Sequence, residues 1–304
     1  MFNTPVLFLV FNRLDTTKQV FAKIREIQPR QLFIGADGAR PEKEGEKEKV
    51  EAVRKYVLDN IDWDCEVKTL FREKNLGCGV AVSEAITWFF ENVEQGIILE
   101  DDTLPDLSFF TFCEELLNYY KDDERVMHIG GTSFQMGKIR GNASYYFSKY
   151  THIWGWATWQ SSWIKYDFRI NNKIGNNLLS ILDYYNFSNN EKTYWLNIFN
   201  QIEQIDTWDY QWFFSIWKSK SVSIVPNVNL ISNLGFGDDA THTKSVNKLS
   251  YLKTIPLSYI NHFSNTLDIK IHQKADDFTF SYAILPKESF IRRIKNKIKK
   301  IISL

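Results

Sequence analysis

This chain of 304 residues has few cysteines, and its positive and negative charges balance. The three cysteines, Cys65, Cys78 and Cys113, are an odd number without the spacing of a zinc site. We therefore expect a reducing compartment and no disulfide framework. A formal net charge of +0 argues against a nucleic-acid partner, because such binders neutralise phosphates over a wide basic face.

Long apolar runs and several catalytic motifs are missing as well. No run is long enough to span a bilayer, and the first residues lack the charged start of a secretory signal, so we expect a cytoplasmic protein. The sequence contains no Walker loop, no paired Cys-x-x-Cys, no His-Glu-x-x-His and no Gly-x-Ser-x-Gly. Gly77 and Gly79 begin like a dinucleotide fingerprint, but Val82 stands where its third small residue belongs.

Apolar and aromatic residues are plentiful, at 44% and 15% of the chain, which is enough for one large α/β domain. In the first half, short apolar runs alternate with helical patterns. We expect strands at 5–11, 31–36, 66–71 and 96–99 and helices at 15–28, 41–60 and 77–92. This alternation predicts a Rossmann-like, mostly parallel sheet flanked by helices. Further on we expect strands at 126–129, 145–147 and 222–225 and helices at 107–120, 160–167, 176–186, 191–205 and 208–218.

The apolar run Ile97–Leu99 ends abruptly in three acids, Glu100, Asp101 and Asp102. A run of this kind is typical of a buried parallel strand, and ligands of open α/β sheets bind outside the carboxyl ends of strands. Adjacent carboxylates there predict a site for Mg²⁺ or Mn²⁺, which prefer oxygen ligands. A solvated turn is the alternative interpretation.

Polar residues follow two other strands at the same edge. Asn12 and Arg13 come after the first strand, and Asp37 comes after the second. A nucleoside diphosphate would suit this edge of the sheet. Arg13 is a fixed cation, Asp37 can accept hydrogen bonds from a base or ribose, and the acidic cluster can bind a metal. Taken singly, Arg13 and Asp37 are more often capping or turn residues.

The second half is rich in tryptophan. Trp154 and Trp156 belong to an indole cluster that is either core or a wall against a sugar ring. We favour core for most of it, and we expect Trp154 or Trp156 to be the exposed member that contacts an acceptor. Asp209 stands in the first turn of a helix, where the helix dipole favours an acid, yet a carboxylate among aromatics also suits a catalytic base. The loop 233–243 carries Asp239 and His242 and is either a mobile lid or a surface turn.

The last residues form a basic amphipathic pattern. From residue 287 onward the chain has seven basic residues and one acidic residue, a net of +6. Apolar residues recur there at helical spacing, at Phe290, Ile291, Ile294, Ile298, Ile301 and Ile302. Such a helix either docks on the domain or lies on an anionic membrane, and we expect residues 288–304 to bind the inner face of the membrane.

These segments together resemble GT-A glycosyltransferases, most closely the N-acetylglucosaminyltransferase I type and its bacterial relatives. The resemblance spans roughly residues 5–240 and rests on the segments 5–13, 31–37, 97–102, 105–106, 154–156 and 208–209. It implies that Asp102 contacts Mn²⁺ or Mg²⁺ and that Glu100 and Asp101 orient ribose and donor sugar. It also implies that Asn12, Arg13 and Asp37 hold the nucleotide.

The resemblance further implies that Asp209 deprotonates the acceptor. The family has a pair of acids at this point, whereas this sequence has one acid between Trp208 and Tyr210. The implied reaction moves a sugar, with inversion, from a UDP-sugar such as UDP-GlcNAc to a glycan or lipid-linked acceptor in polysaccharide synthesis. Residues 1–131 would bind the donor, residues 132–286 would form the acceptor side, and residues 287–304 the terminal helix. A sugar nucleotidyltransferase and a non-catalytic glycan-binding or scaffold protein are the alternatives.

Overall fold

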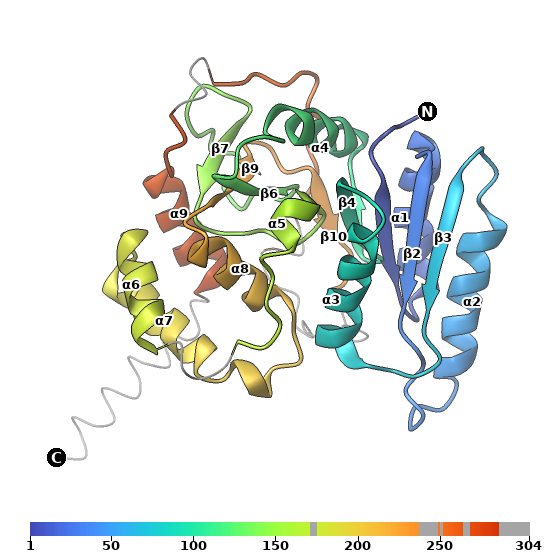
Figure 1. Cartoon of the computed structure of the whole chain (residues 1–304). Helices are drawn as coiled ribbons and strands as arrows, with labels where there is room; N and C mark the ends of the chain where they lie inside the picture. Colours follow the sequence, from blue (N-terminus) through green and yellow to red (C-terminus); the bar gives the residue numbers. More distant parts are fainter. Residues whose placement is uncertain (171–174, 237–248, 250–251, 264–267, 286–304) are drawn as a thin grey trace.

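One mixed sheet of eight strands runs through the molecule (Figure 1). The structure is a computed structural model, and it describes residues 1–170, 175–236, 249, 252–263 and 268–285. The strand order is β3-β2-β1-β4-β8-β6-β9-β7, and four of the seven pairings are parallel. The strands are β1 Val6–Val10, β2 Gln31–Ala36, β3 Glu66–Phe71, β4 Gln95–Glu100, β6 Val126–Gly130, β7 Tyr145–Ser148, β8 Trp156–Trp159 and β9 Val222–Pro226. The prediction of a Rossmann-like α/β fold with a mostly parallel sheet is confirmed.

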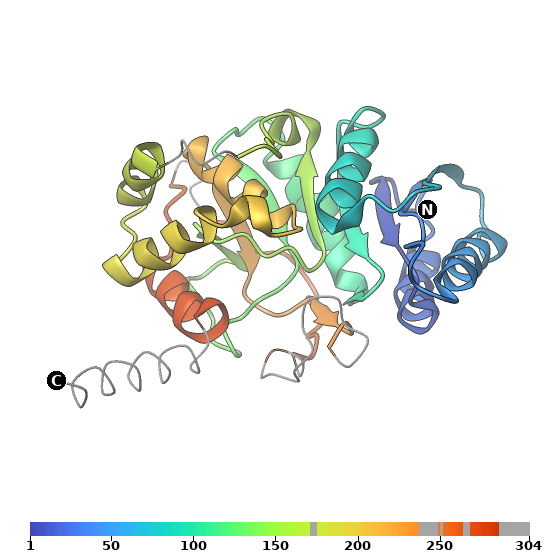
Figure 2. The same cartoon turned by 90° about the horizontal axis from the view of Figure 1, so that it is seen from below.

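Helices cover both faces of this sheet. The α-helices of the described residues are α1 Leu14–Ile27, α2 Glu46–Asp59, α3 Gly77–Phe90, α4 Leu107–Tyr119, α5 Gln160–Trp163, α6 Gly175–Tyr184, α7 Asn189–Phe199, α8 Asp209–Lys218 and α9 Gln273–Thr279. Side chains of α1, α2 and α4 join one hydrophobic core, and those of α3 and α8 join the core on the other face. All five residues of β1 are buried, because its alternate side chains enter the two cores. Both views place α2 and α6 at opposite ends of the molecule (Figure 2).

Strand β8 differs from the expectation for the Trp-rich segment. Residues 156–159 lie antiparallel between β4 and β6, where we expected an indole cluster leading into a helix that ends near 167. The helix α5 is only four residues long. The strand is stable because its side chains alternate between the cores and Thr158 Oγ1 donates a hydrogen bond to the Met127 carbonyl at 2.6 Å.

The helices of the second half enclose a third, largely aromatic core. Lys149 and Glu191 form an ion pair of 3.0 Å there, and neither side chain is more than 2% exposed. Packing therefore accounts for much of the aromatic content beyond residue 145. In the described part of the chain, we find no helix with the length and apolar character needed to cross a bilayer.

Candidate functional site

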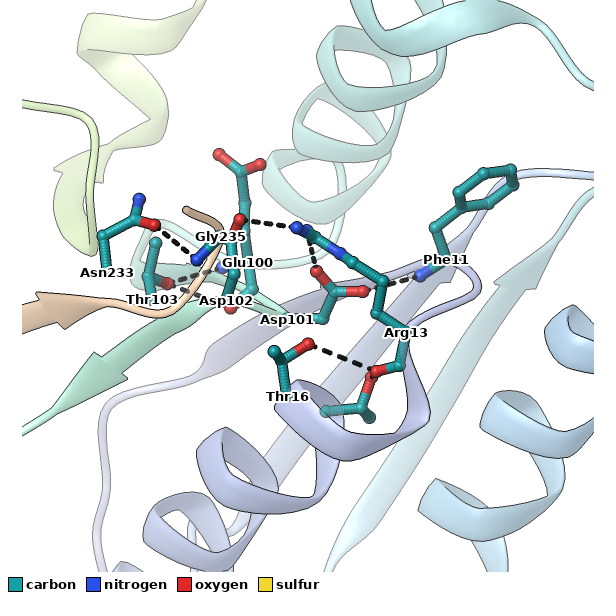
Figure 3. A network of polar contacts seen from close by, with 10 residues as sticks. Phe11, Arg13, Thr16, Glu100, Asp101, Asp102, Thr103, Asn233 and Gly235 are labelled. Atoms are coloured by element: carbon teal, nitrogen blue, oxygen red, sulfur yellow. Dashed lines mark hydrogen bonds and ion pairs between the residues drawn. The ribbon is translucent and has the colours of Figure 1, made fainter. Parts of the chain in front are cut away.

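The three acids lie in a tight turn between β4 and the short strand β5, Thr103–Pro105 (Figure 3). Thr103 Oγ1 accepts a hydrogen bond from the Glu100 amide and donates one to the Glu100 carbonyl, both at 3.0 Å. Strand β5 pairs with β10, Ile231–Asn233, and the Leu234 amide donates to the Asp102 carbonyl at 2.7 Å. The backbone thus fixes the acids from both sides.

Arg13 joins two of these acids, as their positions at neighbouring strand ends predict. Strands β1 and β4 are parallel neighbours, so the residue that caps α1 comes beside the end of β4. The Arg13 guanidinium forms ion pairs with Asp101 and, at 2.9 Å, with Asp102 Oδ2. The Phe11 amide donates to Asp101 Oδ2 at 3.3 Å (Figure 3). The predicted grouping of Arg13 with the acidic turn is present.

The site carries more negative than positive charge. Burial, followed by the charges of Asp102 and Asp101, raises the pKa of Glu100 well above its usual range. Burial also raises the pKa of Asp101, although Arg13 opposes that rise. Arg13 pairs with Asp101 and Asp102, and Glu100 adds a third carboxyl group to the turn, so the local charge favours binding of a further cation.

Asp102 is also enclosed by the segment that follows β10. The Gly235 amide donates to Asn233 Oδ1 at 2.7 Å, which brings the glycine against the acid (Figure 3). A Cβ atom at residue 235 would lie 2.1 Å from Asp102 Oδ2, closer than any side chain can approach. Glycine is therefore required at this position while Asp102 keeps its place.

Asp37 and Asn12 are engaged elsewhere in the structure. The Asp37 carboxylate accepts hydrogen bonds from the amides of Leu76 and Gly77, in the loop that opens α3. Burial raises the pKa of Asp37 in spite of these bonds. The Asn12 side-chain Nδ2 donates a hydrogen bond to Glu46 Oε1 at 2.9 Å, which connects Asn12 to α2. In this conformation neither side chain is paired with the acidic turn.

Asp206 belongs to the same region, and the sequence analysis did not select it. Its carboxylate oxygens accept hydrogen bonds from the amides of Cys78 at 3.0 Å and Gly79 at 2.7 Å. The first turn of α3 has no side-chain cap of its own, so an acid 127 residues away satisfies it. The only local signal was this missing cap.

Asp209 lies close enough to the acidic turn for its charge to act on Glu100. It is the first residue of α8, and its carboxylate accepts hydrogen bonds from the Thr207 hydroxyl and, at 2.9 Å, the Tyr210 amide. Its charge contributes to the raised pKa of Glu100. Burial raises the pKa of the Cys78 thiol, and the charges of Glu100, Asp206 and Asp209 raise it further. Cys78 therefore lies within electrostatic range of both Glu100 and Asp209.

The two tryptophans predicted as acceptor contacts differ in exposure. Trp156 is only 1% exposed and packs against His128, Trp208 and Trp212, so the prediction that it contacts an acceptor is wrong in this conformation. Its place on β8 directs it into the core. Trp154 is half-buried and lies edge-on to the ring of Phe236 at 5.6 Å. Asp239 and His242 lie outside the described residues.

The acidic turn fits a divalent cation in its donor chemistry. Carboxylate oxygens are the ligands that Mg²⁺ and Mn²⁺ prefer, and the excess negative charge favours an additional cation. Within the described ranges, however, no three His, Cys, Asp or Glu side chains form a complete metal-binding group. A cation held here would therefore need oxygen ligands from a bound molecule, as a diphosphate provides.

Comparison with known proteins gives distant structural similarity only. No protein-family model matches the chain, and no curated protein matches its sequence. Mouse xyloside xylosyltransferase 1 has 10% sequence identity and a TM-score of 0.35, over 70% of this chain and 81% of that chain. A UDP-glucose pyrophosphorylase has 9% identity and a TM-score of 0.35, over 73% of this chain and 90% of that chain. HddC from Yersinia pseudotuberculosis has 10% identity and a TM-score of 0.33, over 53% of this chain and 78% of that chain. Similarity at this level does not assign a function.

Proposed function

We propose that the chain is a metal-dependent glycosyltransferase that moves a sugar from a nucleoside diphosphate to a hydroxyl of a glycan or lipid-linked saccharide. The observation that carries this proposal is the acidic turn at the end of β4. Two of its three acids, Asp101 and Asp102, pair with the Arg13 guanidinium. The charge of a fourth acid, Asp209 on α8, contributes to the raised pKa of the third, Glu100. This arrangement suits a donor on one side and an acceptor on the other.

The donor side is proposed to lie between the ends of β1, β2 and β4, within residues 1–131. Asp102 would hold the cation, which stabilises negative charge on the leaving diphosphate as a Lewis acid. Arg13 supplies a fixed positive charge beside Asp101 and Asp102. Asp37, whose carboxylate also accepts hydrogen bonds from the amides of Leu76 and Gly77, is proposed to bind the base, and Glu100 the ribose or sugar. We propose to test UDP first as the nucleotide and UDP-GlcNAc first as the sugar donor.

Asp209 is proposed as the base on the acceptor side, residues 132–286. The Thr207 hydroxyl and the Tyr210 amide fix its carboxylate, which must be oriented to accept a proton from the attacking hydroxyl. One such attack from the face opposite the diphosphate inverts the anomeric carbon. No second base is required, because the leaving group carries its charge without a proton.

The binding of UDP to the full chain tests the donor side. We expect titration calorimetry to detect UDP binding with Mn²⁺ present and little binding without it. Asp102→Ala should abolish the dependence on Mn²⁺. Asp122→Ala is the matched control, because Asp122 is an exposed acid in the turn before β6, and the start of β6 lies at the opposite end of the strands from the acidic turn. Unchanged affinity of Asp102→Ala for UDP with Mn²⁺ would exclude the proposed metal site.

The reaction itself separates the transferase from a nucleotidyltransferase. The sequence after β1, Asn12-Arg13-Leu14, lacks the glycine-rich basic loop that a nucleotidyltransferase would carry. Incubation with a labelled UDP-sugar and a glycan acceptor should release UDP, and not a sugar phosphate. Formation of a UDP-sugar from UTP and a sugar phosphate would favour the alternative.

The C-terminal residues 287–304 lie outside the described residues, so their proposed role rests on sequence. Their net charge of +6 and apolar stripe support binding to an anionic membrane surface, where a lipid-linked acceptor would be found. Deleting residues 288–304 should abolish co-sedimentation with vesicles containing phosphatidylserine. Vesicles of phosphatidylcholine alone are the control, and retained binding after the deletion would refute this role.

A further inference from the structure

An exposed turn, residues 135–140, lies in the connection between β6 and β7. Strands β4 and β6 are both antiparallel to β8, so they run in the same direction and their carboxyl ends share one edge of the sheet. A Cβ atom placed on Gly137 would have no described atom within 4 Å apart from its chain neighbours. The β6–β7 turn therefore projects from the surface, and its connection leaves the sheet at the edge that carries the acidic turn.

The tip of the β6–β7 turn presents apolar side chains to solvent. Met136 and Ile139 are 46% and 61% exposed. The Lys138 amide donates a hydrogen bond to the Gln135 carbonyl at 3.1 Å, and the two residues between them, Met136 and Gly137, have φ angles of 53° and 80°. Turns with two positive φ angles favour glycine, asparagine and aspartate, so methionine at this position costs backbone energy. An exposed apolar side chain is thus kept where a polar residue would be more stable.

Buried polar contacts hold the base of the β6–β7 turn against α9. Gln135 is fully buried, and its Nε2 donates hydrogen bonds to the Ala275 carbonyl at 3.0 Å and to Thr279 Oγ1 at 2.8 Å. Its Oε1 accepts a hydrogen bond from Arg140 Nε at 2.8 Å, and the Arg140 amide donates to Asn227 Oδ1 at 2.7 Å. Because the base is fixed, the tip loses little conformational entropy when it contacts another surface.

The charge around the β6–β7 turn is positive. The turn itself contains two basic residues, Lys138 and Arg140, and no acidic residue. Lys138 Nζ lies 4.3 Å and Arg140 Cζ lies 5.8 Å from the centre of the Phe278 ring on α9. On α9, Lys274 and Asp277 are exposed and Asp276 is buried. Three basic groups therefore stand against one exposed acid on this surface.

Apolar side chains beside basic ones suit the surface of an anionic bilayer. The apolar groups enter the boundary between headgroups and acyl chains, while lysine and arginine are attracted to the lipid phosphates. A nucleic acid would attract the basic groups but would leave Met136 and Ile139 in water. Residues 288–304 and a second copy of the β6–β7 turn both carry net positive charge, so electrostatic repulsion disfavours them as partners.

We propose that the β6–β7 turn is a second membrane contact of this chain, in which Met136 and Ile139 enter an anionic bilayer and Lys138 binds lipid phosphate. A contact of two apolar side chains is too weak to hold the chain alone, so it acts together with residues 288–304. Together they would turn the edge with the acidic turn toward the bilayer. The benefit of that orientation rests on the proposed transferase with a lipid-linked acceptor, whereas the binding itself does not.

Co-sedimentation of the full chain with vesicles of mixed phosphatidylcholine and phosphatidylserine tests this contact. Met136→Asn/Ile139→Asn should lower the affinity for the vesicles by about tenfold or more, because the two apolar side chains are lost. Lys138→Glu should lower it by a similar factor, because it reverses a charge at the lipid surface. Neither variant should lower the temperature of thermal unfolding, because these side chains are exposed and asparagine suits the positive φ of residue 136.

Leu58→Asn/Ile164→Asn is the matched control for the apolar pair. These two side chains are 42% and 80% exposed, at the end of α2 and directly after α5, and their loss should leave the affinity for the vesicles unchanged. Unchanged affinity of both turn variants would overturn the proposal, and so would an equal loss in the control. A chain that binds the vesicles through the β6–β7 turn but does not bind UDP with Mn²⁺ would support the membrane contact and refute the transferase.

Discussion

Gly235 offers a sharp test of the contact between the β10 segment and the acidic turn. In Gly235→Ala the new methyl carbon would lie 2.1 Å from Asp102 Oδ2, while the nearest atom of any other residue, Asn233 Oδ1, would be 3.1 Å away. The carboxylate must therefore move by about 1 Å. The segment itself cannot easily retreat, because the Leu234 amide is bonded to the Asp102 carbonyl at 2.7 Å.

The cost of this movement follows from the ion pair that it breaks. Asp102 Oδ2 lies 2.9 Å from Arg13 Nη1, and the two side chains are only 16% and 24% exposed. A shift of about 1 Å takes this pair out of hydrogen-bonding range. Hydrogen bonds to charged groups contribute about 1.5–3 kcal/mol, so we expect Gly235→Ala to lower the free energy of unfolding by that amount.

The background variant Asp102→Ala separates this mechanism from a general effect of alanine. Without the carboxylate, the new methyl group meets nothing closer than Asn233, and the alanine should be neutral or stabilise by up to about 1 kcal/mol. Urea denaturation is followed by tryptophan fluorescence for the wild type, Gly235→Ala, Asp102→Ala and the double variant. The four free energies of unfolding give the coupling energy between Gly235→Ala and Asp102→Ala. An equal cost of Gly235→Ala in both backgrounds would refute the argument.

Three further predictions follow from groups described above. Asp209→Ala should lower the rate of sugar transfer by about a hundredfold or more while the affinity for UDP stays within about twofold, and an unchanged rate would exclude Asp209 as the base. Burial lowers the pKa of His128 to about 3, so its contribution to stability is complete above pH 6.5 and is lost as the pH falls toward 3. The difference in unfolding free energy between wild type and His128→Leu should thus fall by up to about 1.4 kcal/mol per pH unit below pH 6.5, and a constant difference would contradict this. Lys149→Met should destabilise by about 3–5 kcal/mol because it leaves Glu191 charged and buried, whereas adding Glu191→Gln should restore most of the loss in thermal unfolding.

The first half of the sheet could be predicted because its signals are local. Strands β1 to β4 are apolar runs bounded by turn residues, and the structure places each within two residues of the expected range. Strand β8 could not be predicted in this way. It has four residues, and its pairing partners, such as Ile97 for Ala157, lie far away in the sequence.

The same distinction holds for the candidate site. The proximity of Arg13 to the acidic turn follows from two parallel strands ending at one edge, which the sequence indicates. The bonds of Asp37 to the loop before α3, and the capping of α3 by Asp206, depend on which amides are left unsatisfied in the folded chain. Sequence patterns identify acids, but they do not identify distant amides as their partners.

The position of β8 has a consequence for biosynthesis. Strand β4 is flanked on one side by β1 and on the other by residues 156–159, so one edge of β4 stays open until the ribosome has added the whole stretch after it. That edge carries Gly96, Ile97 and Ile98, an apolar strand able to pair with another nascent chain. A fragment ending at residue 131 would present the same open edge permanently, and we expect it to aggregate when expressed alone. Ligand-binding work on this protein therefore requires a chain that extends through β8.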